Sequence, residues 1–465
     1  MINTTPQDRI VILGAGISSL TAAYVLLKKG IRPLILERSN VAGGLMRNVE
    51  HGDFIVDTGR KELYSRIGEV HALWTELLQD DYKEYTARVG VLYNNRLLEL
   101  SSEFRGKARA MPAGLLLRCI MDYALSKLRY RQPANYEEYR YRLQGRLFTR
   151  IFAQHFHEKF YGRSWQTLPV PDDADIAKNP LRSVPDRVKD SGTESSTISA
   201  LKPRHPDKGA GQIINTLVAE IRRLGGEIWY SAQVKSVQMS GHHIGAIQVQ
   251  HEQEEKILHP ETVISSLPLE TLATLLFGPA VDPKFFSGSM NRGVILIYLF
   301  INEKARFPHV WINVANPNSK LGRITSYGNF NGSMVPENKT CLCLEYFISG
   351  DDDLLSLSDA QLYAYALNDC READLFNPER CEDYRVIRLA HANAAVSWTD
   401  YLHEPAKLHW YEKIRSIINL YNVNRAGTDR AAHAGIKAAE AILSANKEEF
   451  ERLTDATRHK PWEDV

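Results

Sequence analysis

The chain has 465 residues, of which 44% are hydrophobic and 24% charged, and its formal net charge is +1. This length and ordinary globular composition predict two or three domains with ample cores. A net charge so close to zero argues against a nucleic-acid partner, because such binding draws on an excess of positive charge. The five cysteines show neither a CxxC nor a metal-ligand spacing, so we expect a reduced chain without a metal site.

The N-terminal residues carry no apolar signal segment, and no run approaches the roughly 20 apolar residues of a membrane span. We therefore expect a cytoplasmic protein. Residues 105–131 hold seven Lys or Arg around an apolar core at 113–117. Such a basic amphipathic helix can lie on anionic lipid, but a surface helix packed by its leucines is commoner. We expect a surface helix packed by its leucines, with peripheral membrane contact as the alternative.

Residues 9–38 predict a dinucleotide-binding unit, since a buried strand, a glycine turn, a helix and a second strand ending in an acid follow one another there. Gly14 lets the chain turn sharply, and Gly16 leaves room for a pyrophosphate at the helix N-terminus. Ser19 stands where the pattern has its third small residue. Glu37, about 20 residues further on, can accept both hydroxyls of an unphosphorylated ribose, which disfavours NADP.

A second glycine pair and a further strand end favour flavin over nicotinamide. Gly43 and Gly44 follow the ribose-binding strand, and the next strand ends in DTGRK at 57–61. With these segments the chain resembles the FAD-dependent amine oxidase and protoporphyrinogen oxidase superfamily, in particular bacterial proteins similar to UDP-galactopyranose mutase. In that superfamily the glycine pair and the Asp-x-Gly strand end lie along the pyrophosphate and under the isoalloxazine. The segments that are similar to superfamily segments further along are 69–78, 158–162, 208–212, 225–227, 232–234, 263–268 and 424–427.

The resemblance implies FAD as a cofactor that is not covalently attached, since no cysteine lies in the terminal flavin segment. Val234 would contact the adenine through its backbone. Thr428 would cap a helix at 429–444 whose N-terminus faces the flavin. The residues expected to bind FAD are Gly14, Gly16, Ile17, Ser18, Ser19, Glu37, Arg38, Gly43, Gly44, Leu45, Met46, Thr58, Gly59, Arg60, Val234, Ser266, Asn424, Arg425, Gly427 and Thr428.

The positions of these segments predict an α/β fold with a discontinuous Rossmann-type FAD-binding domain. Its three parts are 1–66, 205–280 and 417–446. A mainly helical insertion at 67–204 and a mixed-sheet, substrate-binding insertion at 281–416 would build the substrate side, and 447–465 would form a C-terminal tail.

Within the first insertion, residues 89–100 predict a hairpin that turns at Asn94 and Asn95, because Asn tolerates positive φ. Helices are expected at 112–128 and 136–160. Residues 169–203 lack periodicity and predict a long loop, a candidate lid. In the second insertion, 293–301 and 340–347 alternate like strands of a sheet.

The substrate side is where the chain departs from the family pattern. Gly59-Arg60-Lys61 replaces the Gly-Gly-His or Gly-Pro-His of mutase-like proteins, so Arg60 would sit beside the flavin and bind an anionic group or tune its potential. A solvated loop cation is the alternative. Candidate catalytic residues are Arg60, Lys61 and Trp398, and candidate substrate contacts are Tyr327, Arg323, Glu345 and Tyr346. Arg323 and Glu345 could equally form a surface ion pair, and the aromatic residues could be core.

Three functions fit the sequence. The first is an FAD-dependent oxidoreductase, an oxidase or dehydrogenase that takes a hydride from a small molecule in a biosynthetic pathway. The second is a redox-neutral sugar mutase of the UDP-galactopyranose mutase type, and the third is an FAD-containing scaffold without turnover. We rank the oxidoreductase first, because the mutase-specific residues are partly absent.

Overall fold

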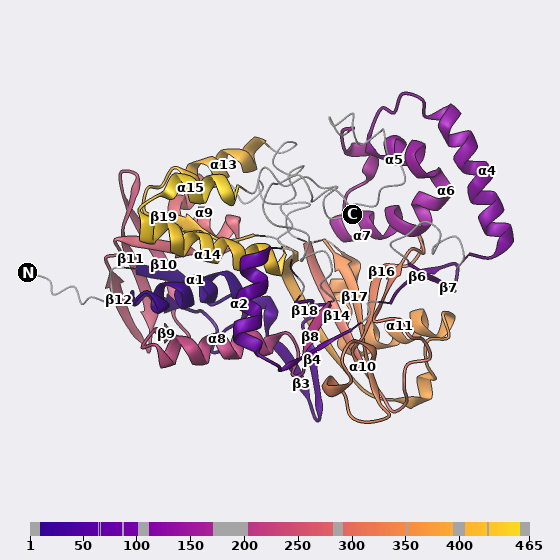
Figure 1. The fold of residues 1–465 in the computed structure, drawn as a ribbon, viewed down its shortest axis with the longest axis horizontal. Coiled ribbons are helices and arrows are strands. Elements are labelled where there is room, and N and C mark those ends of the chain that lie inside the picture. The colour runs from indigo at the N-terminus through magenta and orange to yellow at the C-terminus, as the bar shows by residue number, and fades with distance from the viewer. Residues whose placement is uncertain are drawn as a thin grey trace, which may run out of the picture.

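The fold comes from a computed structural model that describes residues 10–63, 65, 67–85, 88–100, 111–170, 203–281, 292–349, 352–393, 405–425 and 427–455. Figure 1 shows a parallel sheet with its helices at one end of the molecule and a larger sheet at the other, with a group of helices beyond it. No described helix is both long and apolar enough to cross a bilayer.

The N-terminal motif forms the middle of a five-stranded parallel sheet. Its order is β19 (Leu420–Asn422), β13 (Thr262–Ser265), β1 (Ile10–Leu13), β2 (Leu34–Leu36) and β9 (Glu227–Trp229). Strand β1 is apolar at every position because both faces of the sheet are covered. Ile10 and Ile12 pack into one core, and Val11 and Leu13 pack into the other.

One face of this sheet is covered by helices drawn from both ends of the chain (Figure 1). They are α1 (Ile17–Lys28), α2 (Gly68–Leu78), α8 (Gly211–Arg223), α14 (Thr428–Ser444) and α15 (Lys447–Leu453). The other face is covered by α9 (Leu269–Phe277), α13 (Pro405–Arg415) and a three-stranded meander of β10 (Gln233–Ser240), β11 (His243–His251) and β12 (Glu254–Leu258).

A seven-stranded mixed sheet forms the second layer system. Its order is β18 (Cys381–Asn393), β14 (Arg292–Ile301), β17 (Thr340–Ile348), β16 (Leu321–Ser326), β15 (Trp311–Val314), β6 (Val89–Tyr93) and β7 (Arg96–Glu99). The predicted strands at 293–301 and 340–347 are thereby confirmed. The outer face packs on α11 (Asp359–Glu372), and α10 (Tyr327–Phe330) follows β16. Two short ribbons complete the sheets, β3 (Asn48–His51) with β4 (Phe54–Asp57) and β5 (Tyr82–Glu84) with β8 (Arg204–Pro206).

The hairpin predicted at 89–100 is confirmed, with Asn94 and Asn95 at φ 48° and 58°. It belongs to the seven-stranded sheet, since β6 pairs in parallel with β15. The sequence could not indicate this, because the two strands lie more than two hundred residues apart.

The helical region consists of α4 (Ala113–Arg129), α5 (Tyr136–Gln144), α6 (Arg146–Thr149), a π-helical turn (Arg150–Gln154) and α7 (His155–Tyr161). The single helix predicted for 136–160 is therefore wrong. Gly145, at φ 84°, ends α5, and a Cβ there would lie 3.0 Å from the Cα of Tyr123. The predicted loop at 169–203 falls almost wholly outside the described residues.

Helix α4 meets the expectation only in part, because Leu115 and Leu116 pack onto the core beneath it but its other leucines do not. Leu117, Leu125 and Leu128 are 58%, 65% and 79% exposed. Its buried residues are Cys119 and Ser126. The helix lies at the periphery of the molecule (Figure 1), and its apolar stripe faces outward.

Candidate functional site

The two glycine turns of the sequence motif lie against each other at the carboxyl end of β1. Gly14, at φ 90°, turns the chain, and a Cβ on it would lie 2.6 Å from Ser266 Oγ. A Cβ on Gly16 would meet only Ser266 Oγ, at 3.9 Å, so the space in front of Gly16 is open. Gly43 and Gly44 also have positive φ, and a Cβ on Gly44 would lie 3.9 Å from the Cα of Gly16. This cradle suits a pyrophosphate that approaches bare backbone.

Glu37 lies at the end of β2, next to the glycine turn. Its Oε2 accepts a hydrogen bond from the backbone N–H of Ala15, and its Oε1 accepts one from Ser39, both at 2.8 Å. These two bonds fix the carboxylate at the place where a ribose is bound in this kind of unit, and two backbone bonds leave lone pairs for the hydroxyls.

The closing segment reaches the same place from the other end of the chain. Asn424 donates from Nδ2 to the carbonyl of Ser266, at 3.0 Å. The guanidinium of Arg425 donates to the carbonyls of Asn422, Asn424 and Thr454. Its side chain therefore ties the terminal helix to the sheet, and a contact with FAD would have to come from its backbone.

The predicted cap of the last helix is wrong. Helix α14 begins at Thr428, one residue earlier than expected, and the N-cap position is Gly427. Thr428 thus lies inside the first turn, where its hydroxyl contacts the sulfur of Met46 at 3.5 Å. Gly427 has no side chain with which to cap the helix, and the helix N-terminus adjoins the turn that contains Met46.

The other predicted cofactor residues differ in how far they are buried. Ile17, Ser18 and Ser19 are buried in the first turn of α1, so their contribution to a ligand would come from the helix N-terminus. Arg38 and Leu45 are exposed, and Val234 is partly buried in β10 opposite Val249. Thr58 donates its hydroxyl to the carbonyl of Arg47, at 2.6 Å.

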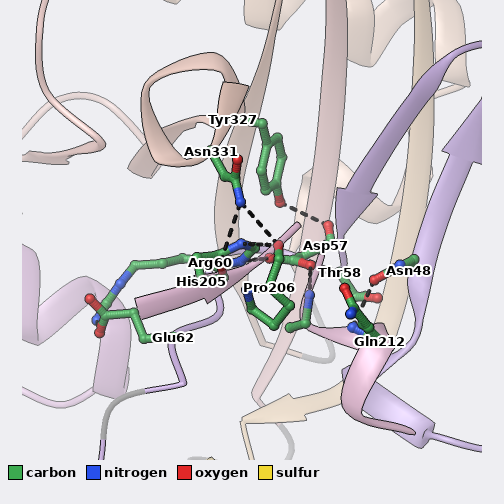
Figure 2. Close-up of polar contacts among 12 residues, drawn as sticks. Asn48, Asp57, Thr58, Arg60, Glu62, His205, Pro206, Gln212, Tyr327 and Asn331 are labelled. Carbon is green, nitrogen blue, oxygen red and sulfur yellow. Dashed lines mark hydrogen bonds and ion pairs between the residues drawn. The ribbon is translucent and has the colours of Figure 1, made fainter. Parts of the chain in front are cut away.

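Two tyrosines, from β14 and α10, clamp the end of strand β4, and Figure 2 shows Tyr327 beside it. The carbonyl of Asp57 accepts hydrogen bonds from the hydroxyls of Tyr298 and Tyr327, each at 2.8 Å. Tyr327 also lies 3.0 Å from the carbonyl of Gly59, and the N–H of Gly59 donates to Tyr298 at 3.2 Å. Tyr327, a predicted substrate contact, is thus fully buried and holds the strand end.

Sequence reasoning missed a buried pair below this clamp. Asp57 Oδ2 lies 2.8 Å from Nε2 of His205, and both side chains are 1% exposed or less. Asp57 Oδ1 accepts the N–H of Ala210 at 2.7 Å, and Asn331 donates to the carbonyls of His205 and Pro206 (Figure 2). The pair joins the returning FAD-domain segment to β4. Only the Asp-x-Gly strand end pointed to Asp57, and no local pattern singled out His205.

Arg60 and Lys61 follow directly. The N–H of Arg60 donates to Glu345 Oε1 at 3.0 Å, and its guanidinium pairs with Glu62 and lies over the ring of Trp311, 4.1 Å from the centroid. Burial opposes its charge, but Glu62 raises the pKa of Arg60 above its usual value. Burial lowers the pKa of Lys61, although Glu345 acts in the opposite direction. Arg60 is therefore not a solvated loop cation.

Arg323 and Glu345 form an ion pair at 3.1 Å, and their side chains are 9% and 6% exposed. The expected surface ion pair is therefore a buried one, and burial lowers the pKa of Arg323. Glu345 lies against Gly59, where a Cβ would come within 3.7 Å of its carboxylate. Arg60, Lys61, Arg323 and Glu345 thus meet at the end of β4.

Tyr346 does not join them. Successive residues of a strand point to opposite faces, so Tyr346 faces away from Glu345. Its hydroxyl donates to Asp369 on α11 at 2.7 Å, and its ring packs into the outer core of the sheet. The prediction of Tyr346 as a substrate contact is therefore wrong. Trp398 lies outside the described residues.

Comparisons with known proteins agree with this arrangement. Residues 17–445 match the family described as flavin containing amine oxidoreductase. Over 54 residues, 12% of the chain, it is 44% identical to a phytoene dehydrogenase from Streptomyces griseus. The chain spans only about a tenth of the length of the curated relatives it matches, 11% in this case.

Two solved structures share the fold over nearly the whole chain. A reduced UDP-galactopyranose mutase has a TM-score of 0.72 at 16% identity and covers 97% of this chain and 99% of its own. A candidate protoporphyrinogen oxidase from Exiguobacterium sp. 255-15 has a TM-score of 0.68 at 14% identity, with 95% and 100% covered. The cradle fits the flavin cofactor of the family, which is FAD. The chain belongs to the flavin containing amine oxidoreductase family.

Proposed function

We propose that this protein is an FAD-dependent oxidoreductase that takes a hydride from a small-molecule substrate, bound between the end of β4 and the inner face of the seven-stranded sheet. The observation that carries the proposal is the junction at Gly59. There, just beyond the end of β4, the backbone N–H of Arg60 donates to the carboxylate of Glu345 on the sheet at 3.0 Å, and charged side chains gather beside it.

The residues proposed to hold FAD come from four places along the chain. The open backbone at Gly16 and Gly44 would receive the pyrophosphate, Glu37 would accept the ribose hydroxyls, and the N-terminus of α14 would face the ring. FAD supplies the hydride acceptor when it is bound. The two tyrosine hydroxyls on Asp57 keep the strand end rigid against the sheet.

We propose that Lys61 moves protons at this junction. A lysine with a lowered pKa releases its proton more readily than an exposed one, and Nζ of Lys61 donates no hydrogen bond within the described part of the chain. Apolar residues of the inner sheet face, such as Leu296 next to Gly59, would exclude water from the reacting atoms.

The second candidate is a redox-neutral sugar mutase. Its support is the overall likeness to UDP-galactopyranose mutase, which at 16% identity is a likeness of fold. Arg60 and Lys61 stand where mutase-like proteins have Gly-His or Pro-His, which is why we rank this function second.

A flavin-reduction screen tests the proposal. The purified protein should be yellow, and an anaerobic panel of amines, porphyrinogens and nucleotide sugars should contain a donor that bleaches the visible flavin absorbance. A nucleotide sugar that is isomerised only after dithionite reduction, without consumption of oxidant, would support the mutase instead. A colourless protein that cannot be reconstituted with FAD would overturn both functions.

A further inference from the structure

Three basic side chains surround two carboxylates at the end of β4. We call Arg60, Lys61, Arg323, Glu62 and Glu345 the cationic cluster. Arg60 and Arg323 bind opposite oxygens of Glu345, at 3.0 Å through the backbone N–H of Arg60 and at 3.1 Å through Nη1 of Arg323. The cluster is continuous, because the Arg60 guanidinium pairs with Glu62. The five side chains of the cluster together carry one excess positive charge. Asp57 lies nearby but is not counted among them, and its carboxylate contacts His205.

Every carboxylate oxygen of the cluster already accepts a hydrogen bond. Glu62 accepts from Arg60 and from the hydroxyl of Tyr85, the latter at 3.1 Å. Glu345 accepts on both oxygens from the two arginines. The donors are in surplus, since a guanidinium has five N–H donors and an ammonium three.

Two of the surplus donors are buried. The Nε atoms of both Arg60 and Arg323 are inaccessible to solvent and have no hydrogen-bond partner. Lys61 donates no hydrogen bond within the described residues. Buried donors without acceptors are costly and rare, so a cluster of them indicates an acceptor that arrives from outside the chain.

The burial of the positive charges of Lys61 and Arg323 also indicates a bound anion. The pKa values of Lys61 and Arg323 are lowered by desolvation, and Glu345 compensates only in part. Aromatic rings keep solvent away, with Trp311 under Arg60 and Phe156 5.1 Å from the Arg323 guanidinium. A bound anion would stabilise both charges in this low-dielectric surrounding.

We propose that Arg60, Lys61 and Arg323 form an oxyanion-binding subsite for a carboxylate or phosphate group of the substrate. This inference rests on the proposed function, which places substrate at the same junction. A planar guanidinium binds such oxyanions in a fixed geometry, and the ammonium adds a point charge. The substrate class is thereby narrowed to anionic molecules, with the reacting bond held at a fixed distance from the anionic group.

The test uses the FAD-loaded protein and small probes. Benzoate and inorganic phosphate represent the two oxyanions, and benzamide is the neutral isostere of benzoate. At constant ionic strength, each probe is titrated while the flavin absorbance and the unfolding temperature are recorded. We expect saturable binding of at least one anion and none of benzamide, and benzoate against phosphate identifies which group the subsite prefers.

The variants Arg60→Met and Lys61→Met should weaken anion binding by about tenfold or more, because each removes charge-assisted hydrogen bonds. Lys304→Met is the matched control, since Lys304 is exposed in the loop after β14 and should leave the affinity unchanged. Arg60→Lys keeps the charge and should retain part of the affinity if Arg60→Met does not fold.

FAD content separates the outcomes. Yellow wild-type protein that binds no anion, or binds it equally in all variants, overturns the oxyanion subsite and leaves the oxidoreductase proposal intact. Variants that lose FAD while they keep anion binding would show that the cluster serves the cofactor, which also overturns the subsite. Wild-type protein that cannot hold FAD contradicts the proposed function itself.

Discussion

Gly14 and Gly16 are two residues apart, but the structure gives them different tasks. Gly14 must be glycine for two reasons: its φ is positive, and Ser266 leaves no room for a side chain at this position. Gly16 has an ordinary φ of −78°, and nothing but Ser266 Oγ at 3.9 Å lies near its missing side chain. The first glycine therefore serves the fold, and the second leaves open the space where we propose that the cofactor binds.

Substitution should separate the two tasks. Gly16→Val should abolish FAD retention, because its methyl groups fill the approach to the backbone, but it should cost less than about 1 kcal/mol of apoprotein stability. Gly14→Ala should lower the free energy of unfolding by about 1–3 kcal/mol through backbone strain. FAD-to-protein ratios and thermal melts of the apoproteins measure both effects. A stable, yellow Gly16→Val protein would contradict the cradle.

At the same scale, the sequence could identify residues whose task is local. The glycines and Glu37 stand at fixed spacings within one strand-turn-helix unit, so pattern alone located them. His205 could not be found in this way, because its partner Asp57 lies 148 residues earlier. Arg425 was found by its motif, but its bonds to the carbonyl of Thr454 depend on a helix that the motif does not include.

At the scale of elements, neighbouring residues of strand β17 point to opposite faces of the sheet, so that one contacts the candidate site and the next packs against a supporting helix. Glu345 faces the end of β4, where it contacts Arg60, and Tyr346 faces α11. The sequence located the strand but not which of its faces meets the end of β4, since both faces are buried and apolar residues occur on each. Which face is which depends on non-local pairing with β14 and β16.

Paired tyrosine variants test this division. Tyr327→Phe should destabilise the protein by about 1–3 kcal/mol, because two buried carbonyls lose a donor, and it should also alter the flavin spectrum by releasing the strand end at Gly59. Tyr346→Phe should lower stability as well but leave the flavin spectrum unchanged. Melts and absorbance spectra of the FAD-loaded variants decide, and identical spectra for both would argue against the clamp.

For helix α4 we predict that substitutions of its exposed leucines hardly change the stability of the protein. Leu125→Glu and Leu128→Glu should change the free energy of unfolding by no more than about 0.5 kcal/mol, because these side chains are 65% and 79% exposed. Phe148→Ala, in the core beneath the helix, should cost about 3–5 kcal/mol. Denaturant melts measure both.

The same variants test the peripheral membrane contact that the basic pattern of this helix raised. If the exposed stripe lies on lipid, wild-type protein should sediment with anionic vesicles and the glutamate variants should not. Equal recovery in the supernatant would exclude membrane contact through this helix. A marked loss of stability in the glutamate variants would instead show that the stripe is covered in solution.

At the scale of the whole molecule, the five-stranded sheet is assembled from distant stretches of chain. Strand β13 lies between β1 and β19, and α14 packs directly on α1 (Figure 1). Motif spacing predicted a discontinuous domain because each stretch carries its own segment similar to the superfamily. The addition of β6 and β7 to the far sheet had no such marker, since strand pairing across long sequence separations leaves no local pattern.

The contact between α1 and α14 makes the cofactor cradle depend on both ends of the chain. A Cβ on Gly435 would lie 2.2 Å from the carbonyl oxygen of Ser18, so Gly435→Ala must push the helices apart. We expect a loss of about 1–3 kcal/mol from overpacking. FAD binding should weaken as well, because Gly16 and Gly427 are the N-cap residues of α1 and α14, and the two helix starts would move relative to each other. Gly114→Ala in α4 is the matched control, since no atom lies within 4 Å of its added methyl, and it should leave FAD affinity unchanged. FAD titration and thermal melts of both variants provide the measurement, and a Gly435→Ala protein with wild-type FAD affinity would show that the cradle tolerates displacement of the two helices.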